Sequence, residues 1–233
     1  MNVLAVGAHP DDLELLCGGA LALYSQNGHK IFMCHTLNGN LGHEKIPRDE
    51  LRDIRRQEAI NAAKIINAES MTIDIDDMDI HDTQETRLKM AEIIRKADPD
   101  IIITHSPDDY HTDHNITSGV VFNSSFASTL PQLKTETPCN KKITPIYYID
   151  TVVGVNFQPE EYVDITDVIE IKKEMFSCHK SQVSWLKEHH KIDMIEFMYS
   201  FARFRGMQCG VKYAEGFKQL KVWGRIFPKR FLP

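Results

Sequence analysis

Short β-rich runs alternate with longer helical patterns over the first two thirds of the chain, and this alternation constrains the fold more than any other feature. It is typical of β-α-β units built around a parallel sheet. The first unit shows the pattern: 3–7 is a short apolar run, and 13–26 carries Leu, Ala and Tyr at helical spacing before Gly28. We therefore predict an α/β fold with a mostly parallel sheet.

The remaining elements follow from the same periodicities. The run Ile101-Ile102-Ile103 is continuously apolar, as a parallel strand covered by helices on both faces requires. Beyond residue 130 the pattern loosens, so we expect the carboxyl third to close over the sheet as a cap. No linker or repeat divides the chain, which predicts a single domain over residues 1–233. Further strands are expected at 30–37, 71–75, 100–105 and 146–155, and further helices at 48–67, 85–97, 165–177 and 189–204.

The composition is that of an ordinary soluble protein, with 42% apolar and 26% charged residues. A formal charge of −6 argues against nucleic acid and anionic lipid as partners, because both favour dense Lys/Arg surfaces. The amino-terminal run lacks a basic leader, and no apolar stretch approaches the roughly 20 residues that span a bilayer. These features predict a cytoplasmic protein without a membrane span. A homo-oligomer is compatible with the sequence, which does not decide the oligomeric state.

The segment Ala8-His9-Pro10-Asp11-Asp12 lies at the carboxyl end of the first predicted strand, where open α/β sheets bind their ligands. An imidazole and a carboxylate three residues apart on a tight turn can reach one divalent ion, and Pro10 stiffens that turn. We therefore predict His9 and Asp12 as metal ligands.

A second cluster, His111-Thr112-Asp113-His114, follows the strand predicted at 100–105. A catalytic zinc typically keeps three protein ligands and an open position for water, and His114 completes such a set with His9 and Asp12. Iron(II) or cobalt(II) would fit the same nitrogen and oxygen donors.

Three residues of the two clusters then remain for catalysis. Asp11, next to a ligand, is the predicted general base for a water that the metal activates. His111 would stabilise the oxyanion or protonate the leaving amine, and Asp113 would orient His111 by a hydrogen bond.

At these residues the sequence resembles the LmbE-like or PIG-L family of zinc deacetylases, which carry A-H-P-D-D after the first strand and a later H-x-D-H. The run from His9 to Gly19, H-P-D-D-L-E-L-L-C-G-G, is similar to the H-P-D-D-x-E-x-x-x-x-G of bacillithiol-pathway members, which deacetylate a glucosaminyl malate. The resemblance implies a Rossmann-like fold, a single deacetylase domain, zinc ligation by the two histidines and the second aspartate, and general-base work for the first aspartate.

Two residues are predicted to contact substrate. Arg55-x-x-Glu58-x-x-x-Ala62 resembles a family helix whose arginine lies near the substrate, which implies that Arg55 binds sugar hydroxyls or a carboxylate; a surface ion pair is the alternative. Asp77, in an acidic run at 74–79, could meet sugar hydroxyls or simply be solvated. Gly18-Gly19 lacks a G-x-G-x-x-G context, so close helix packing explains the pair better than a phosphate loop.

Two departures from the family pattern stand out. Thr112 replaces a proline that is common inside the second motif, and Tyr110 lies one position after the place where some members have an active-site tyrosine, which Asp109 holds here.

Together these features predict a zinc-dependent hydrolase that removes the acetyl group from an N-acetylglucosamine-type sugar, releasing acetate and an amine. The alternatives are a zinc amidase or esterase that acts on a larger conjugate, and a metal-stabilised sugar-binding module. The sequence does not identify the aglycone.

Overall fold

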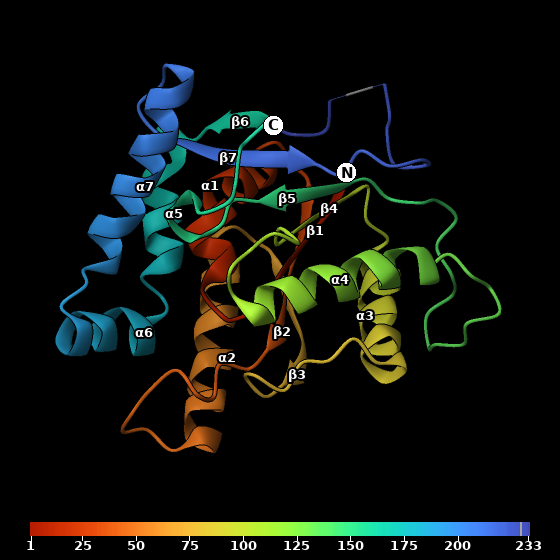
Figure 1. Ribbon diagram of the computed structural model, residues 1–233, viewed down its shortest axis with the longest axis horizontal. Coiled ribbons are helices and arrows are strands. Elements are labelled where there is room, and N and C mark those ends of the chain that lie inside the picture. The colour runs from red at the N-terminus through yellow and green to blue at the C-terminus, as the bar shows by residue number, and fades with distance from the viewer. Residues whose placement is uncertain (229) are drawn as a thin grey trace.

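The computed structural model describes residues 1–228 and 230–233, and its central feature is a sheet with helices on both faces (Figure 1). Within these residues the strand order is β3-β2-β1-β4-β5-β7-β6. The first five strands in this order are parallel, and β7 runs antiparallel to both of its neighbours. The strands are β1 (Asn2–Gly7), β2 (Lys30–Leu37), β3 (Glu69–Ile75), β4 (Ile101–Thr104), β5 (Ile146–Ile149), β6 (Glu161–Asp164) and β7 (Ala214–Gln219).

The helices form two layers, and each layer buries one face of the sheet. One core contains side chains of α1, α2, α5 and α7, and the other contains side chains of α3 and α4. No described helix is long and apolar enough to cross a membrane. The helices are α1 (Asp12–Gln26), α2 (Arg48–Ile65), α3 (Gln84–Ala97), α4 (Thr112–Ala127), α5 (Ile169–Phe176), α6 (Lys180–Trp185) and α7 (Met194–Cys209), with short 3-10 turns η1 (Val152–Gly154) and η2 (Thr166–Val168) and a π-helical turn η3 (Leu186–His190).

The predicted α/β fold is confirmed, and the elements up to β4 lie where the periodicity placed them. The carboxyl third differs from the prediction. The strand expected over 146–155 ends at Ile149, because the chain turns and Val153 adopts a left-handed backbone with φ 63°. The last long helix begins at Met194 rather than near residue 189, because the Asp193 side chain accepts the N–H groups of Ile195 and Glu196 as an N-cap.

The carboxyl third also contributes more than a cap. Its helices α5 to α7 cover one face of the sheet, but β6 and β7 extend the sheet itself beyond β5 (Figure 1). β7 has the sequence Ala-Glu-Gly-Phe-Lys-Gln, which carries little of the β-branched character that identifies strands.

The path of the chain reverses between β1 and β4. β1 pairs with β2 on one side and β4 on the other, so the connections that leave these two strands diverge. A crevice opens at such a switch point, at the carboxyl ends of the strands. The loops that follow β1 and β4 both border it.

A buried ion pair ties α1 to the carboxyl third. Lys172 Nζ lies 2.5 Å from Glu215 Oε1, and the Glu215 carboxylate also accepts the backbone N–H groups of Gly19 and Ala20. Both charged side chains are buried. A side chain at position 19 would place its Cβ 2.6 Å from Ile165, so this glycine lets α1 pack closely against the residue between β6 and η2.

Removal of Glu215 should destabilise the fold strongly. Glu215→Ala would leave the Lys172 ammonium buried without a counter-ion, so we expect the free energy of unfolding to fall by about 3–5 kcal/mol. Urea denaturation would measure this change. Glu160→Ala is the control, because its partner Lys221 is exposed and such surface pairs contribute about 1 kcal/mol or less. Equal losses in the two variants would show that the buried pair does not stabilise the fold.

Candidate active site

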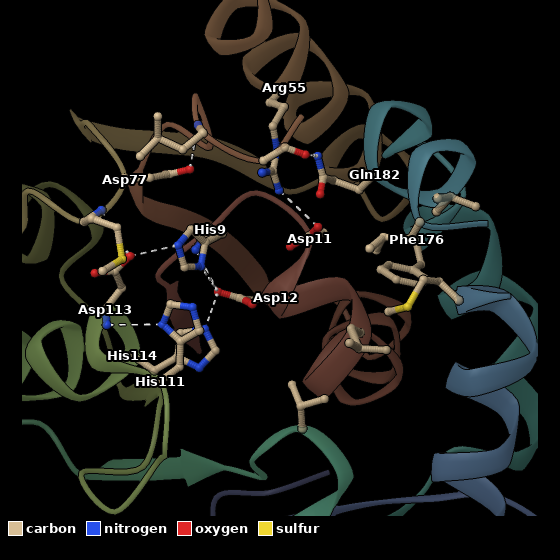
Figure 2. Close-up of a pocket in the computed structure, with 18 of the residues that line it drawn as sticks. His9, Asp11, Asp12, Arg55, Asp77, His111, Asp113, His114, Phe176 and Gln182 are labelled. Atoms are coloured by element: carbon tan, nitrogen blue, oxygen red, sulfur yellow. Dashed lines mark hydrogen bonds and ion pairs between the residues drawn. The ribbon is translucent and has the colours of Figure 1, made fainter. Parts of the chain in front are cut away.

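The crevice at the switch point collects the side chains of both sequence motifs (Figure 2). The turn from β1 into α1 supplies His9, Asp11 and Asp12, and the first turn of α4 with its cap supplies the 111–114 motif. These side chains line a cavity of about 530 Å³. Two segments far apart in the sequence, with His9 and Asp113 separated by 104 positions, therefore meet at one place.

The three predicted metal ligands lie together. One ligand atom from each of His9, Asp12 and His114 falls within 4.8 Å of the others. Asp12 Oδ2 lies 3.5 Å from His9 Nδ1 and 3.4 Å from His114 Nε2. Two imidazole nitrogens and a carboxylate oxygen form a donor set that suits zinc, with a further position left for water.

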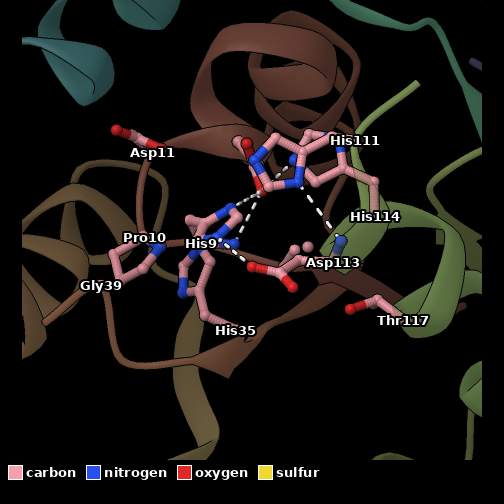
Figure 3. Close-up of polar contacts among 12 residues, drawn as sticks. His9, Pro10, Asp11, His35, Gly39, His111, Asp113, His114 and Thr117 are labelled. Atoms are coloured by element: carbon pink, nitrogen blue, oxygen red, sulfur yellow. Dashed lines mark hydrogen bonds and ion pairs between the residues drawn. The ribbon is translucent and has the colours of Figure 1, made fainter. Parts of the chain in front are cut away.

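Two more aspartates lie behind the histidines. Asp113 Oδ2 is 3.2 Å from His9 Nε2 (Figure 3), and Asp109 Oδ2 is 2.9 Å from His114 Nδ1. Each histidine thus has one ring nitrogen engaged by a carboxylate and the other directed at Asp12. Histidines that bind metals usually donate their second N–H to a carboxylate, which fixes the tautomer and orients the ring.

The charges in this cluster favour a cation. Burial lowers the pKa of His9, but hydrogen bonds to Asp113 and Asp12 outweigh burial and raise this pKa to about 9. Burial also opposes the charge on His114, and the Asp12 and Asp109 carboxylates raise its pKa to about 10. Two protonated imidazoles therefore balance the carboxylates in the metal-free protein, and a divalent cation would displace those protons. The residues fit a zinc ion.

Asp11 lies beside the ligand Asp12 but points to a different neighbour. Its carboxylate accepts a hydrogen bond from Arg55 Nη2 at 3.0 Å. Burial raises the pKa of Asp11, and the Arg55 charge opposes this rise. The backbone of Asp11 has φ 123° and ψ −24°, a region that non-glycine residues rarely occupy, and such strain costs about 1–3 kcal/mol and clusters at functional sites.

Arg55 lines the cavity, but its guanidinium binds protein groups. Besides Asp11, it donates to the carbonyl oxygens of Pro10 and Gly39. Cβ atoms at Gly39 and Gly42 would come within 2.7 Å of the guanidinium, which explains the glycines of this loop. Arg55 therefore forms an ion pair that positions Asp11 and its turn, and this pair is buried rather than at the surface. The predicted contact of Arg55 with substrate stays a prediction.

Asp77 also lines the cavity and supports the same loop. Its carboxylate accepts the backbone N–H of Gly39 at 2.8 Å and that of Leu41 at 3.0 Å. The side chain is buried rather than solvated. Its predicted contact with sugar hydroxyls would have to use the lone pairs that these bonds leave free.

His111 occupies the predicted place at the rim of the cluster. Its ring stacks on His114 with centroids 4.6 Å apart, and its Nδ1 accepts the backbone N–H of Asp113. Burial and the charges of His114 and His9 lower its pKa. The prediction that the Asp113 carboxylate orients His111 is not met, because the turn at the start of α4 directs this carboxylate to His9.

His105 and the pair Glu14 and His179 were not identified from the sequence as buried polar residues near the site. His105 is buried, stacks on His114 at 3.9 Å and accepts the N–H of Ala8 through Nε2. That bond makes Nε2 an acceptor, so the 3.3 Å to Asp12 is a contact rather than a hydrogen bond. A second group is Glu14 with His179 Nε2 at 3.1 Å, both fully buried. A histidine directly at the end of β4 was the available signal for the first group.

Comparisons with known proteins bear on the family of this chain. A family model described as PIG-L, GlcNAc-PI de-N-acetylase, matches residues 4–124. The chain is 25% identical to a 4-oxalmesaconate hydratase of Pseudomonas putida, over 98% of this chain and 90% of the relative. It is 27% identical to a "Probable N-acetyl-alpha-D-glucosaminyl L-malate deacetylase 2" of Bacillus cereus, over 82% of this chain and 89% of the relative.

The fold has solved counterparts as well. The N,N'-diacetylchitobiose deacetylase from Pyrococcus horikoshii matches with a TM-score of 0.82 and 26% identity, over 94% of this chain and 83% of that chain. The match to the family model spans more than half of the chain and includes every residue of the two metal motifs. This confirms the resemblance that the motifs indicated, and the chain belongs to the PIG-L family.

Proposed function

We propose that this protein is a zinc-dependent deacetylase that hydrolyses the N-acetyl group of an N-acetylglucosamine-type sugar. The observation that carries the proposal is the grouping of His9, Asp12 and His114 with the Asp11 carboxylate beside them in one cavity. Relatives named as deacetylases of N-acetylated sugars support the substrate class.

In the proposed reaction, a water molecule attacks the amide carbon and the C–N bond breaks. Asp11 accepts the proton of the water, and its raised pKa brings it closer to that task at neutral pH. His111, at the cavity wall, would stabilise the oxyanion or pass a proton to the leaving amine. Asp113 and Asp109 hold His9 and His114 in place, and Arg55 holds Asp11.

Zinc bound by His9, Asp12 and His114 would polarise the amide carbonyl and lower the pKa of the water. Iron(II) or cobalt(II) would suit the same donors. The cytoplasmic location, the extent of the domain over 1–233 and the oligomeric state stay predictions from the sequence.

The hydratase relative makes a different reaction in this family a fair alternative, and the cavity argues against it here. A solved hydratase of Pseudomonas putida with a similar fold is named for 4-carboxy-2-hydroxymuconate, a carboxylated substrate. Among the described residues that line the cavity, Arg55 is the one lysine or arginine, and it is bound to Asp11 and two backbone carbonyls. Amide hydrolysis of a neutral sugar suits this lining better. A broad amidase would cleave bulky acyl groups as readily as acetyl, and a binding module would release no acetate.

Loss of a ligand should abolish metal binding. Dialysed wild-type protein should hold about one zinc per chain. Asp12→Ala or His114→Ala should hold almost none, because removal of one of three ligands removes most of the affinity for zinc. Asp109→Asn should weaken zinc affinity by about 10- to 100-fold, because Asp109 orients His114. Elemental analysis and chelator competition measure both quantities. Asp108→Asn, an exposed acid next to Asp109, is the matched control. Full zinc content in Asp12→Ala would exclude the proposed site.

The general base can be tested by an isosteric change. Asp11→Asn keeps the size of the side chain and tolerates the unusual backbone, but it cannot accept the proton. We expect acetate release from N-acetylglucosamine derivatives to fall by about 10²- to 10⁴-fold while zinc content is unchanged. Asp79 is an exposed acid two positions after the cavity residue Asp77, and Asp79→Asn should behave as wild type. Retained turnover in Asp11→Asn would remove the role assigned to Asp11.

A further inference from the structure

One wall of the cavity is apolar. Phe176 of α5, Val183 of α6, Leu186 of η3 and Met194 of α7 all line it. Figure 2 shows Phe176 on the far side of Asp11 from His9 and His114. The wall therefore bounds the cavity on the side opposite to Asp113 and the two histidines.

The mouth of the cavity is apolar as well. Leu41, Met78 and Tyr110 follow β2, β3 and β4 and line the cavity, yet their exposed fractions are 48%, 64% and 56%. Exposed apolar side chains that gather around a pocket mark a binding surface more often than single ones do. We call these three residues the apolar rim.

Met78 is held at this rim by its backbone. It has φ 65°, a left-handed conformation that side-chain-bearing residues rarely adopt. Its N–H donates to Asp113 Oδ2 at 3.2 Å, and the same carboxylate binds His9. The backbone of Met78 is thus fixed relative to the predicted metal ligands.

Apart from His9 and His114, which would hold the metal, the cavity offers no free positive side chain for an anionic group. Four carboxylates line it, those of Asp11, Asp12, Asp77 and Asp113. The only lysine or arginine among its described lining residues is Arg55, which is already bound to Asp11. A malate, phosphate or other anionic aglycone would gain no ion pair here and would meet like charges.

We propose that the substrate is an N-acetylated amino sugar whose aglycone is uncharged and apolar, such as an alkyl or aryl group. The aglycone lies against the apolar rim, and the wall formed by α5 to α7 bounds the opposite side of the cavity. Met78, Leu41 and Leu186 then determine specificity. This inference rests on the proposed deacetylase function and names the substrate class for the same site.

The test compares three N-acetylglucosaminides in both anomers with zinc-loaded protein: the methyl glycoside, the butyl glycoside and the 1-phosphate. We expect kcat/KM for the butyl glycoside to exceed that for the methyl glycoside by about tenfold. Butyl adds three methylenes, each of which would contribute about fourfold if fully buried, and the exposed rim buries them only in part. The 1-phosphate should be the poorest substrate. Acetate release provides the measurement.

Variants test the rim directly. Met78→Asn replaces the thioether by a polar group, and asparagine tolerates the left-handed backbone. The ratio of kcat/KM for the butyl glycoside to that for the methyl glycoside should fall severalfold, because KM for the butyl glycoside rises. Met207→Asn is the matched control, because Met207 is 66% exposed and lies on α7 outside the cavity lining, so its ratio should equal that of wild type.

The outcomes separate the two proposals. Acetate from the methyl glycoside with no butyl preference, or with the 1-phosphate preferred, would overturn the apolar aglycone and leave the deacetylase standing. No acetate from any glycoside would overturn both. A further outcome is that Met78→Asn changes the oligomeric mass of the protein in solution and leaves the butyl-to-methyl ratio of kcat/KM unaltered. The rim would then be an interface between copies of the chain, which also contradicts the inference.

Discussion

The buried carboxylate of Asp12 is the interaction on which the rest of the crevice depends. It lies within 3.5 Å of His9 and His114, and His105 also packs against it. Burial works against its charge, but the charge of His114 and the hydrogen bonds from His114 and His9 keep the pKa of Asp12 well below its usual range. A buried charge of this kind must be matched by partners from its surroundings. The loops after β1 and β4 are therefore fixed to each other by the same group that is proposed as a metal ligand.

A second layer of buried polar contacts keeps the strained turn at Asp11 in place. Arg55 reaches from α2 to Asp11 and Pro10, and Asp77 reaches from the end of β3 to the loop that Arg55 also contacts. Strain of this kind persists only when neighbouring structure determines it fully. Arg55 and Asp77 thus act mainly on protein groups around the crevice. Asp11, His111 and the three proposed ligands are left to act on substrate in the proposed reaction.

The sequence allowed the fold class, the elements up to β4 and the clustering of the two motifs to be predicted, because periodicity and strand ends are local signals. The strands β6 and β7 escaped prediction because neither is apolar enough to stand out. His105 and Asp109 escaped because their roles depend on packing against His114, which no spacing reveals. The prediction that Asp113 contacts His111 was wrong for a related reason. Whether its carboxylate meets His9 or His111 depends on the orientation of one helical turn.

The cavity is assembled from two stretches of chain with separate tasks. The predicted metal ligands and Asp11 lie within residues 4–124, the stretch that the family model matches, whereas Phe176, Val183, Leu186 and Met194 lie beyond it. Replacements on α5 to α7 can reshape the space next to the reacting bond without disturbing Asp12 or its histidines. Such a division would let descendants of one ancestor exchange substrates, and even reactions, while inheriting the same cluster of aspartates and histidines.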